Sequence, residues 1–412
     1  MVAMYRCIDS RSHIDRLLGM GCYLTDTDPA KPVYPLSQYS FYVYEYIEGI
    51  GVLRPPILPP RSRGGLHIYL LIKGGVDTYN AINTIRRIMR PRRVSYYGLK
   101  DSRARSYQAI IVEDPERLYT YIYDRYFEAI LIGAAYRHAE RKDLVGNCFK
   151  IFLDRISDDR DLGKALITID RISEIGYIPN YYSYQRFGVS RPITHLLGLA
   201  IACRSYKTVL EIMVHGFKIL SAGFSGDKDL LEGCARILSS APRWMNIERR
   251  ACSEYMRSKD PVRSVKSLPK EYISLYISAL LSYLFNIYLS KRWRDHGIGL
   301  EPIGSEIQML SRIYGAKIPG VKISLSNDAG MMLKEEIDLM MEILGIKGCD
   351  VRRVRTYIER PILLPIAIDR RTWSLEFCLD KGGYATNLLR EVFKEHSPSL
   401  FSPNLDLGSH DQ

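Results

Sequence analysis

Asp101 lies in a short run of residues whose types suit chemistry on a sugar or a base: Gly98-Leu99-Lys100-Asp101-Ser102-Arg103. An ionised carboxylate can attack a carbon atom or remove a proton, and neighbouring cations keep its pKa low. Lys100, Arg103 and Arg105 are such neighbours. An aspartate that follows a glycine most often just caps a turn, so this run needs support from the rest of the chain.

Basic residues gather around this run and at two other places, and the chain carries a formal charge of +12 with a pI near 9.2. Clustered Lys and Arg gain free energy by displacing counterions from phosphates, which favours a nucleic acid as the partner. A charged surface of the kind found in thermophiles is the alternative. The three clusters are Arg86, Arg87, Arg90, Arg92 and Arg93; Arg137, His138, Arg141 and Lys142; and Arg352, Arg353, Arg355 and Arg360.

A second stretch combines four aromatic side chains with amides and an arginine: Ile178-Pro179-Asn180-Tyr181-Tyr182-Ser183-Tyr184-Gln185-Arg186-Phe187-Gly188. Such a mixture suits stacking on a flipped-out base and hydrogen bonding to its edge. Asn180, Tyr182 and Arg186 are the candidates for these contacts. A tyrosine-rich turn in the core would have the same composition, so both interpretations stay open.

The hydrophobic patterns predict an α+β protein with a helical insertion. The first part should contain strands at 66–73, 94–97 and 108–112 and helices at 77–90 and 115–126. From about residue 200 to 350 helical patterns dominate, including 272–291 and 333–344. Strand patterns return at 362–368 and 373–379, before a helix at 384–395. We therefore expect one domain from residues 1–199 and 355–412, interrupted by a helical insertion at 200–354.

The segment from Tyr272 to Ser290 is uncharged and just long enough to span a membrane. A polar residue recurs at every fourth position, at Ser274, Ser278, Ser282, Asn286 and Ser290. On a helix this spacing forms one polar stripe on an otherwise apolar rod. We interpret the segment as a helix buried against other helices, and expect no membrane association.

The eight cysteines are scattered singly, without a Cys-x-x-Cys pair or a nearby pair of histidines. This distribution argues against a zinc site. Residues 1–20 mix Arg and Asp into their apolar positions, which does not resemble a signal peptide. The sequence therefore predicts a cytoplasmic protein with reduced thiols and no metal.

Six motifs, taken in order, resemble the TruD family of tRNA pseudouridine synthases. Gly98 to Gln108 resembles the family's run around its catalytic aspartate, and 179–188 resembles its Pro-Asn-Tyr-aromatic and Gln-Arg-Phe-Gly motif. The other similar segments are Gly146-Asn147-Cys148-Phe149, Arg191-Pro192 with Thr194-His195, Ser282-Tyr283-Leu284-Phe285-Asn286, and Gly383-Tyr384-Ala385-Thr386 with Leu389-Arg390-Glu391. The last three resemble the archaeal and eukaryotic branch.

The resemblance implies a pseudouridine synthase domain with a mixed, mainly antiparallel sheet and a helical TRUD insertion. It implies an isomerase that acts on tRNA, at uridine 13 or also at position 35 of precursor tRNA-Tyr, without a metal or organic cofactor. Asp101 would be the catalytic carboxylate, Tyr182 would stack on the uracil, and Asn180 would hold the loop or the aspartate. The predicted RNA-binding residues are Lys100, Arg103, Arg105, Arg86, Arg87, Arg90, Arg137 and Arg186. We expect a monomer.

Two positions depart from the family pattern. Pro35 takes the place of an N-terminal lysine that would face the catalytic carboxylate, and Lys31 could replace it only in a shifted register. Leu281 replaces a glutamine before the Ser-Tyr-x-Phe-Asn run. These changes leave a tRNA-binding protein with weak activity as the alternative function. A metal-dependent nuclease would need several clustered carboxylates or histidines, whereas the surroundings of Asp101 are basic.

Overall fold

A computed structural model describes most of the chain. It covers residues 4–55, 65–100, 102, 104–188, 191–216, 230–242, 245–304, 306–313, 316–325, 333–350, 358–371 and 373–394. Asp101 and Arg103 lie outside the described residues, and so do three members of the third basic cluster, Arg352, Arg353 and Arg355.

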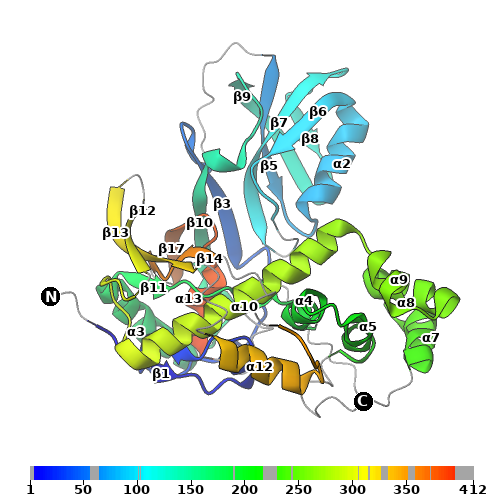
Figure 1. Ribbon diagram of the computed structural model, residues 1–412. Coiled ribbons are helices and arrows are strands. Elements are labelled where there is room, and N and C mark those ends of the chain that lie inside the picture. The colour runs from blue at the N-terminus through cyan, green and yellow to red at the C-terminus, as the bar shows by residue number, and fades with distance from the viewer. Residues whose placement is uncertain are drawn as a thin grey trace.

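A large mixed sheet runs through the molecule and joins its two halves (Figure 1). β3 and β7 pair in parallel, and the other strand pairs of this sheet are antiparallel. The strand order is β16 (Asp369–Arg371), β17 (Ser374–Asp380), β10 (Leu144–Phe152), β3 (Phe41–Ile47), β7 (Arg105–Pro115), β5 (Leu66–Lys73), β9 (Phe127–Ala135) and β8 (Tyr121–Tyr123), with β4 (Gly51–Val52) beside β3 and β6 (Pro91–Tyr96) beside β7. The expectation of an α+β fold with a mainly antiparallel sheet is confirmed.

The upper half of Figure 1 contains α2 (Thr78–Met89) packed on one face of the sheet. The Asp77 side chain accepts a hydrogen bond from the Asn80 amide, which caps the helix as its sequence position predicts. Ile82, Ile85 and Met89 of α2 pack with the sheet in one apolar cluster. The predicted strand 66–73 and the helix after it are therefore confirmed, and they fix the start of the Asp101 loop.

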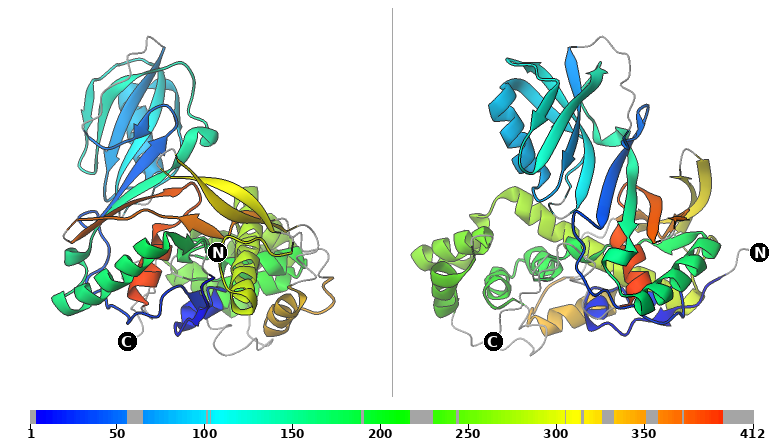
Figure 2. Two further views of the ribbon diagram at one scale, coloured as in Figure 1. Left: turned by 90° about the vertical axis from the view of Figure 1, so that its left-hand side faces the viewer. Right: turned by 180° about the vertical axis from the view of Figure 1, so that it is seen from behind.

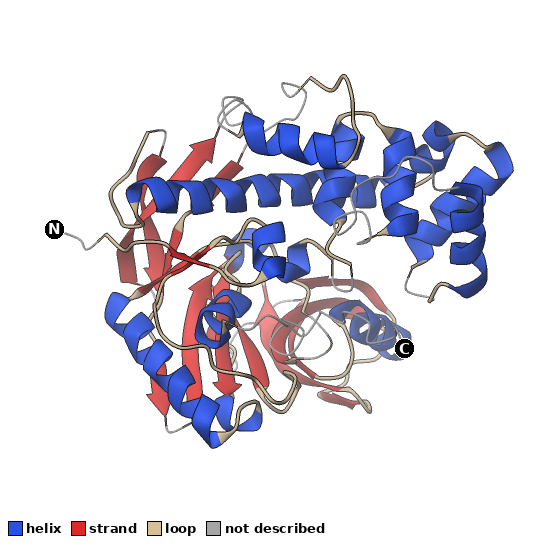
Figure 3. Ribbon diagram, turned by 90° about the horizontal axis from the view of Figure 1, so that it is seen from below, coloured by secondary structure: helices blue, strands red, loops and turns tan. Residues whose placement is uncertain are grey.

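Helices fill the lower half, where α10 (Lys270–His296) runs beneath the sheet (Figures 1 and 3). α10 packs along α4 (Thr194–Ala202). The helices between residues 230 and 266, at the right of Figure 1, pack against one another and against α5 (Tyr206–His215), which also contacts α4. The remaining helices are α1 (His13–Leu17), α3 (Asp159–Ile175), α5 (Tyr206–His215), α7 (Leu230–Ser240), α8 (Asn246–Ser258), α9 (Pro261–Lys266), α12 (Lys334–Ile343) and α13 (Ala385–Phe393), with 3-10 turns at Arg141–Asp143, Leu153–Arg155 and Tyr184–Arg186. The predicted helices near 272–291, 333–344 and 384–395 are confirmed.

One expectation about local structure is wrong, and the largely helical segment 200–354 contains strands as well. Residues 115–126 form no helix: β7 ends at Pro115 and β8 follows at Tyr121–Tyr123, where Ile122 is buried between two exposed tyrosines, a period of two. The segment 200–354 also contains the hairpin of β12 (Glu306–Ile313) and β13 (Ala316–Leu325). β14 (Ile358–Pro361) extends this hairpin; two small sheets pair β1 (Ile8–Asp9) with β2 (Cys22–Tyr23) and β11 (Tyr177–Pro179) with β15 (Leu363–Pro365).

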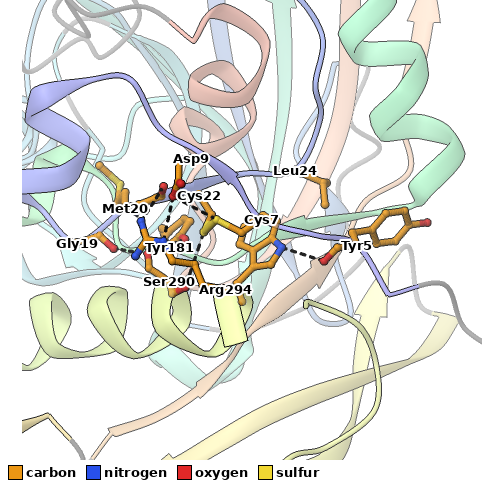
Figure 4. The surroundings of a disulfide bond; sticks show 12 residues. Tyr5, Cys7, Asp9, Gly19, Met20, Cys22, Leu24, Tyr181, Ser290 and Arg294 are labelled. Carbon is orange, nitrogen blue, oxygen red and sulfur yellow. Dashed lines mark hydrogen bonds and ion pairs between the residues drawn. A yellow bond between two sulfur atoms is a disulfide. The ribbon is translucent and has the colours of Figure 1, made fainter. Parts of the chain in front are cut away.

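The expectation of reduced thiols is wrong for six of the cysteines. Three disulfides join Cys7 to Cys22, Cys148 to Cys378 and Cys203 to Cys349, whereas Cys234 and Cys252 are free and buried. The spacing along the chain could not reveal these pairs, because Cys148 and Cys378 meet only through the pairing of β10 with β17. Figure 4 shows that the Cys7–Cys22 bond lies beside Ser290 and Arg294 of α10.

α10 is the one helix, among the described residues, that is long and apolar enough to cross a membrane, and 56% of its most apolar window is buried within the protein. Its polar stripe is used inside the molecule. Ser290 accepts a hydrogen bond from the Gly21 amide and donates one to the Gly19 carbonyl, and Asn286 donates to the Leu18 carbonyl. The interpretation of 272–290 as a buried helix with a polar stripe is confirmed.

Candidate functional site

The backbone on both sides of Asp101 is held by the turn between β5 and α2. The Lys100 amide donates to Thr78 Oγ1 over 2.9 Å, and the Lys73 ammonium donates to the Lys100 carbonyl over 3.0 Å. On the other side of Asp101, the Gly75 amide donates to the Ser102 carbonyl over 2.7 Å. The loop predicted to carry the chemistry is thus attached at the residue before Asp101 and at the residue after it.

Lys73 is a buried cation at this turn. It is the last residue of β5, only 1% exposed, and its ammonium also donates to the Val76 carbonyl over 3.0 Å. The segment with Pro35 in place of the family lysine lies close by, because the Gln38 side chain packs against Gly74. Lys31 is exposed, and its backbone hydrogen-bonds to Asp161 of α3. The structure therefore puts Lys73, and not Lys31, beside the Asp101 loop.

Lys100 is bound to a buried carboxylate. Its ammonium lies 2.8 Å from Glu45 Oε1, whose side chain is fully buried on β3. The other oxygen of Glu45 accepts the Ala109 amide over 3.0 Å, and Gln108 donates to the Gly98 carbonyl over 2.9 Å. These contacts fix the start of the loop to β3 and β7. Lys100 therefore holds the loop in position, and it would have to leave Glu45 to bind a phosphate.

Alternate side chains of the 178–188 stretch turn to two different buried arginines. Tyr181 and Tyr184 face Arg390 of α13, which lies 2.7 Å from the carboxylate of Asp15. Tyr184 donates its hydroxyl proton to the same carboxylate. Burial raises the pKa of Tyr181 to about 12 and that of Tyr184 well above its usual value. This half of the stretch is a core turn, as the structural interpretation predicted.

Asn180 and Tyr182 face Arg360 of β14 instead. The Arg360 guanidinium lies 3.8 Å from the centre of the Tyr182 ring and donates to Asn180 Oδ1 over 2.6 Å and to the Asn180 carbonyl over 3.0 Å. Tyr182 is half-buried, with Phe285 at 5.6 Å and Tyr384 at 6.3 Å between ring centres, both edge-on. The result is an aromatic wall formed by Tyr182, Phe285 and Tyr384, with the Arg360 guanidinium on the Tyr182 ring.

The polar stripe of α10 holds the same stretch in place. Arg186 donates to Ser282 over 3.0 Å and also to Ser278, and its guanidinium lies 5.9 Å from the Tyr182 ring centre. Asn286 accepts the Tyr182 amide over 2.8 Å and donates to the Tyr182 carbonyl over 2.9 Å. Tyr182 is thereby fixed through its backbone as well as through its ring.

The sheet connects the start of the Asp101 loop with the strand that precedes Tyr384. Glu45, Asn147 and Leu379 lie opposite one another on β3, β10 and β17. They share a face with Phe149, because side chains two residues apart on a strand point the same way. Lys100 binds Glu45 at one end of this row, and Leu379 at the other end precedes Tyr384 by five residues.

The predicted RNA-binding arginines differ in their surroundings. Arg86, Arg87 and Arg90 are exposed at the end of α2, where Arg90 makes an exposed ion pair with Glu116 over 3.5 Å. Arg105 is half-buried at the start of β7. Arg137 binds both oxygens of Asp143, at 2.6 and 2.7 Å, and also Glu140. Arg86 and Arg87 are thus freest to meet a phosphate, whereas Arg137 would have to leave two carboxylates.

Three residues of the site were missed by the sequence reasoning: Lys73, Glu45 and Arg360. Arg360 was counted only as part of a basic cluster, although it is 7% exposed. Lys73 could have been found from its position in the apolar strand pattern of 66–73, because a lysine is rarely buried without a partner. No local pattern marks Glu45, whose importance depends on the parallel pairing of β3 with β7.

Comparisons with known proteins agree on one family. The model of the family described as tRNA pseudouridine synthase D (TruD) matches residues 17–311. A Pyrobaculum islandicum protein named probable tRNA pseudouridine synthase D is 27% identical, over 93% of this chain and 97% of its own. Its counterpart of the same name from Saccharolobus solfataricus is 28% identical, over 81% and 85%. A Methanosarcina mazei crystal structure described as TruD shares the fold, with a TM-score of 0.63 and 21% identity over 93% of this chain and 98% of that one.

Proposed function

The chain belongs to the tRNA pseudouridine synthase D family, a family of isomerases. From this premise we propose that it converts a uridine of tRNA into pseudouridine and that Asp101 is the catalytic carboxylate. The site is of the uridine-13 type, and position 35 of precursor tRNA-Tyr is a second candidate. The observation that carries the proposal is the attachment of the loop on both sides of Asp101, at Lys100 and at Ser102, to the turn that contains Lys73 and Gly75.

The reaction is an isomerisation that balances without an oxidant or reductant. The bond between C1′ of the ribose and N1 of the uracil breaks, and its electron pair leaves with the base. After the base turns, C5 forms a bond to C1′, C5 loses its proton, and N1 gains one. Asp101 acts at the sugar as a nucleophile or a base, which requires the ionised carboxylate. Among the described residues, no group of carboxylates that could hold a metal ion lies at the loop.

Lys73 supplies the positive charge that the missing N-terminal lysine would bring. Its ammonium binds the carbonyl of the peptide unit that joins Lys100 to Asp101. An opposite charge within about 4–6 Å favours the ionised form of a carboxyl group. We therefore propose Lys73 as the cation that keeps Asp101 ionised, because Lys100 is bound to Glu45.

The uracil stacks on Tyr182 once the uridine is turned out of the RNA. Asn180 positions this residue through its bonds to Arg360 and to the Pro361 carbonyl. Arg86, Arg87, Arg90, Arg105 and Arg103 bind the phosphates around the site, and Arg137 and Lys100 do so where the RNA displaces their present partners. The enzyme acts as a cytoplasmic monomer, and residues 200–354 are the family's insertion.

A purified-protein assay tests the proposal. The wild type is incubated with a tRNA transcript, and pseudouridine is detected by carbodiimide-dependent primer stops. We expect a stop with the wild type, and with Asp101→Ala a rate lower by more than about 10³-fold. The dissociation constant for tRNA should change less than about threefold, because Asp101 contributes no positive charge. Activity in Asp101→Ala would refute the catalytic assignment.

The same assay distinguishes the proposed enzyme from the alternative function. A tRNA-binding protein with weak activity would bind the transcript with wild-type affinity and leave no primer stop. The loss of the N-terminal lysine at Pro35 is the observation that favours it. The buried ammonium of Lys73 beside the loop favours an active enzyme instead.

A further inference from the structure

Arg360 carries a buried charge that no carboxylate neutralises within the described residues. Three arginines are at least nine-tenths buried: Arg390, Arg292 and Arg360, at 2%, 5% and 7% exposure. Arg390 lies 2.7 Å from Asp15, and Arg292 lies 2.9 Å from Glu306. Arg360 instead binds the Asn180 carbonyl, Asn180 Oδ1 and the Gly382 carbonyl, which are all neutral.

The directions of the pKa shifts show the same difference. Burial lowers the pKa of Arg360. Burial also acts to lower the pKa of Arg390, but the carboxylate of Asp15 and the hydroxyls of the surrounding tyrosines together outweigh it, and the net shift is upward. Arginine stays protonated in proteins, so Arg360 is a full positive charge in a poorly hydrated place. A buried charge without a counter-ion is costly, so such a charge suits an anion that arrives with the substrate or forms from it.

The cation stands directly behind the candidate uracil-binding ring. The guanidinium lies 3.8 Å from the centre of the Tyr182 ring, and Arg186 adds a second cation at 5.9 Å. An aromatic face is electron-rich and would repel an anionic base stacked on it. A guanidinium on the ring offsets that repulsion through its own attraction to the π electrons. The pair of Tyr182 and Arg360 is thus suited to an anionic base rather than a neutral one.

We propose that Arg360 is a positioning residue that holds Asn180 and Tyr182 and places a buried positive charge behind the base, so that the site favours the detached uracil anion over the intact uridine. The inference rests on the proposed function. When the bond from C1′ to N1 breaks, its electron pair stays with the uracil, and the negative charge spreads over N1 and the two carbonyl oxygens. Charge that develops in the transition state is where a fixed cation contributes most to the rate.

The test compares Arg360→Gln and Arg360→Lys with a control substitution of Asn387, an uncharged residue that holds the same loop. Asn387 of α13 donates to the Tyr181 carbonyl over 2.7 Å and is 5% exposed, so Asn387→Ala loosens the loop without removing charge. The measurements are the single-turnover rate of pseudouridine formation, the dissociation constant for tRNA and the melting temperature. Arg360→Gln should slow the single turnover by about 10²-fold, with tRNA affinity changed less than about threefold.

Arg360→Lys keeps the charge and should recover about tenfold of that loss. Asn387→Ala should lower the melting temperature while its single-turnover rate stays within about threefold of wild type. If Arg360→Gln is no slower than Asn387→Ala, or if its rate loss is matched by weaker tRNA binding, the inference is overturned.

A substrate with a better-stabilised anion gives a readout of charge alone. In a transcript that contains 5-fluorouridine, the fluorine withdraws electrons and stabilises the uracil anion by itself, so Arg360 should matter less. We expect the effect of Arg360→Gln on cleavage of the C1′–N1 bond to shrink by about tenfold with this transcript. An undiminished effect would show that Arg360 only shapes the loop. If Arg360→Gln does not fold, Arg360→Met, which also lacks the positive charge, takes its place in the comparison between the two transcripts.

The outcomes also separate this inference from the proposed function. A wild type without pseudouridine formation refutes both. A wild type that is active, with Asp101→Ala inactive and Arg360→Gln equal to Asn387→Ala, refutes only the role of Arg360.

Discussion

Two buried arginines lie on either side of one short stretch, and only one of them is neutralised. Arg390 binds Asp15, and Tyr181 and Tyr184 pack around that pair. Arg360 lies over Tyr182 and binds Asn180. The two views of Figure 2 show the C-terminal elements that carry both arginines packed beneath the sheet. The neutralised arginine holds the molecule together, and the other leaves its charge for the site.

The difference shows how one motif serves two purposes. The side chains of residues 181 and 184 enter the core cluster, while Tyr182 stays half-buried at its edge. The core residues keep the backbone in place, so the half-buried Tyr182 needs no flexibility to present its ring. Substitutions in each half distinguish the stabilising role from the role in the site.

Asp15→Asn should destabilise the protein strongly and leave the chemistry alone. It would turn Arg390 into a buried cation without a counter-ion, which costs about 3–5 kcal/mol of folding free energy. The measurement is the unfolding free energy from denaturant titration, together with the single-turnover rate at a temperature where the variant is folded. Asp9→Asn is the control, because Asp9 makes an ion pair with Arg294 that is exposed and should contribute less than about 1 kcal/mol. Equal stability of the two variants would remove the contrast between the arginines.

Lys73→Met should move the acid limb of the pH–rate profile to higher pH. In the proposed role the Lys73 ammonium keeps the Asp101 carboxyl group ionised, so without it the carboxylate should become protonated at a higher pH. A shift of about one to three units is expected. Lys291→Met is the control, since Lys291 of α10 pairs with Glu336 of α12 and not with the Asp101 loop. An unchanged acid limb in Lys73→Met would mean that another group keeps Asp101 ionised.

Tyr182→Phe should have the smallest effect. If stacking over the guanidinium of Arg360 is the main role of Tyr182, phenylalanine keeps the ring and the rate should fall less than about threefold. The measurement is the single-turnover rate at saturating enzyme. A collapse of the rate would instead assign proton transfer to the Tyr182 hydroxyl, which would then matter more for catalysis than the ring.

The sequence by itself was sufficient for the family, the α+β class and most of the elements. The polar stripe of α10 predicted a helix that binds its neighbours through Ser282, Asn286 and Ser290, because side chains four residues apart share a helix face. Asp101, Asn180 and Tyr182 were named from motifs in order. The β8 segment was misread as a helix, since a short apolar run does not reveal its period when only Ile122 points inward.

Only the tertiary structure decided which charges are neutralised. Arg390 and Asp15 are 375 residues apart in the chain, and Arg360 meets Asn180 across 180 residues. Local composition records that an arginine is present, but whether its charge is balanced depends on what the fold places beside it. The same holds for Lys73, whose ammonium reaches the carbonyl of Lys100 through the turn after β5 and is therefore the proposed substitute for the lysine absent at Pro35.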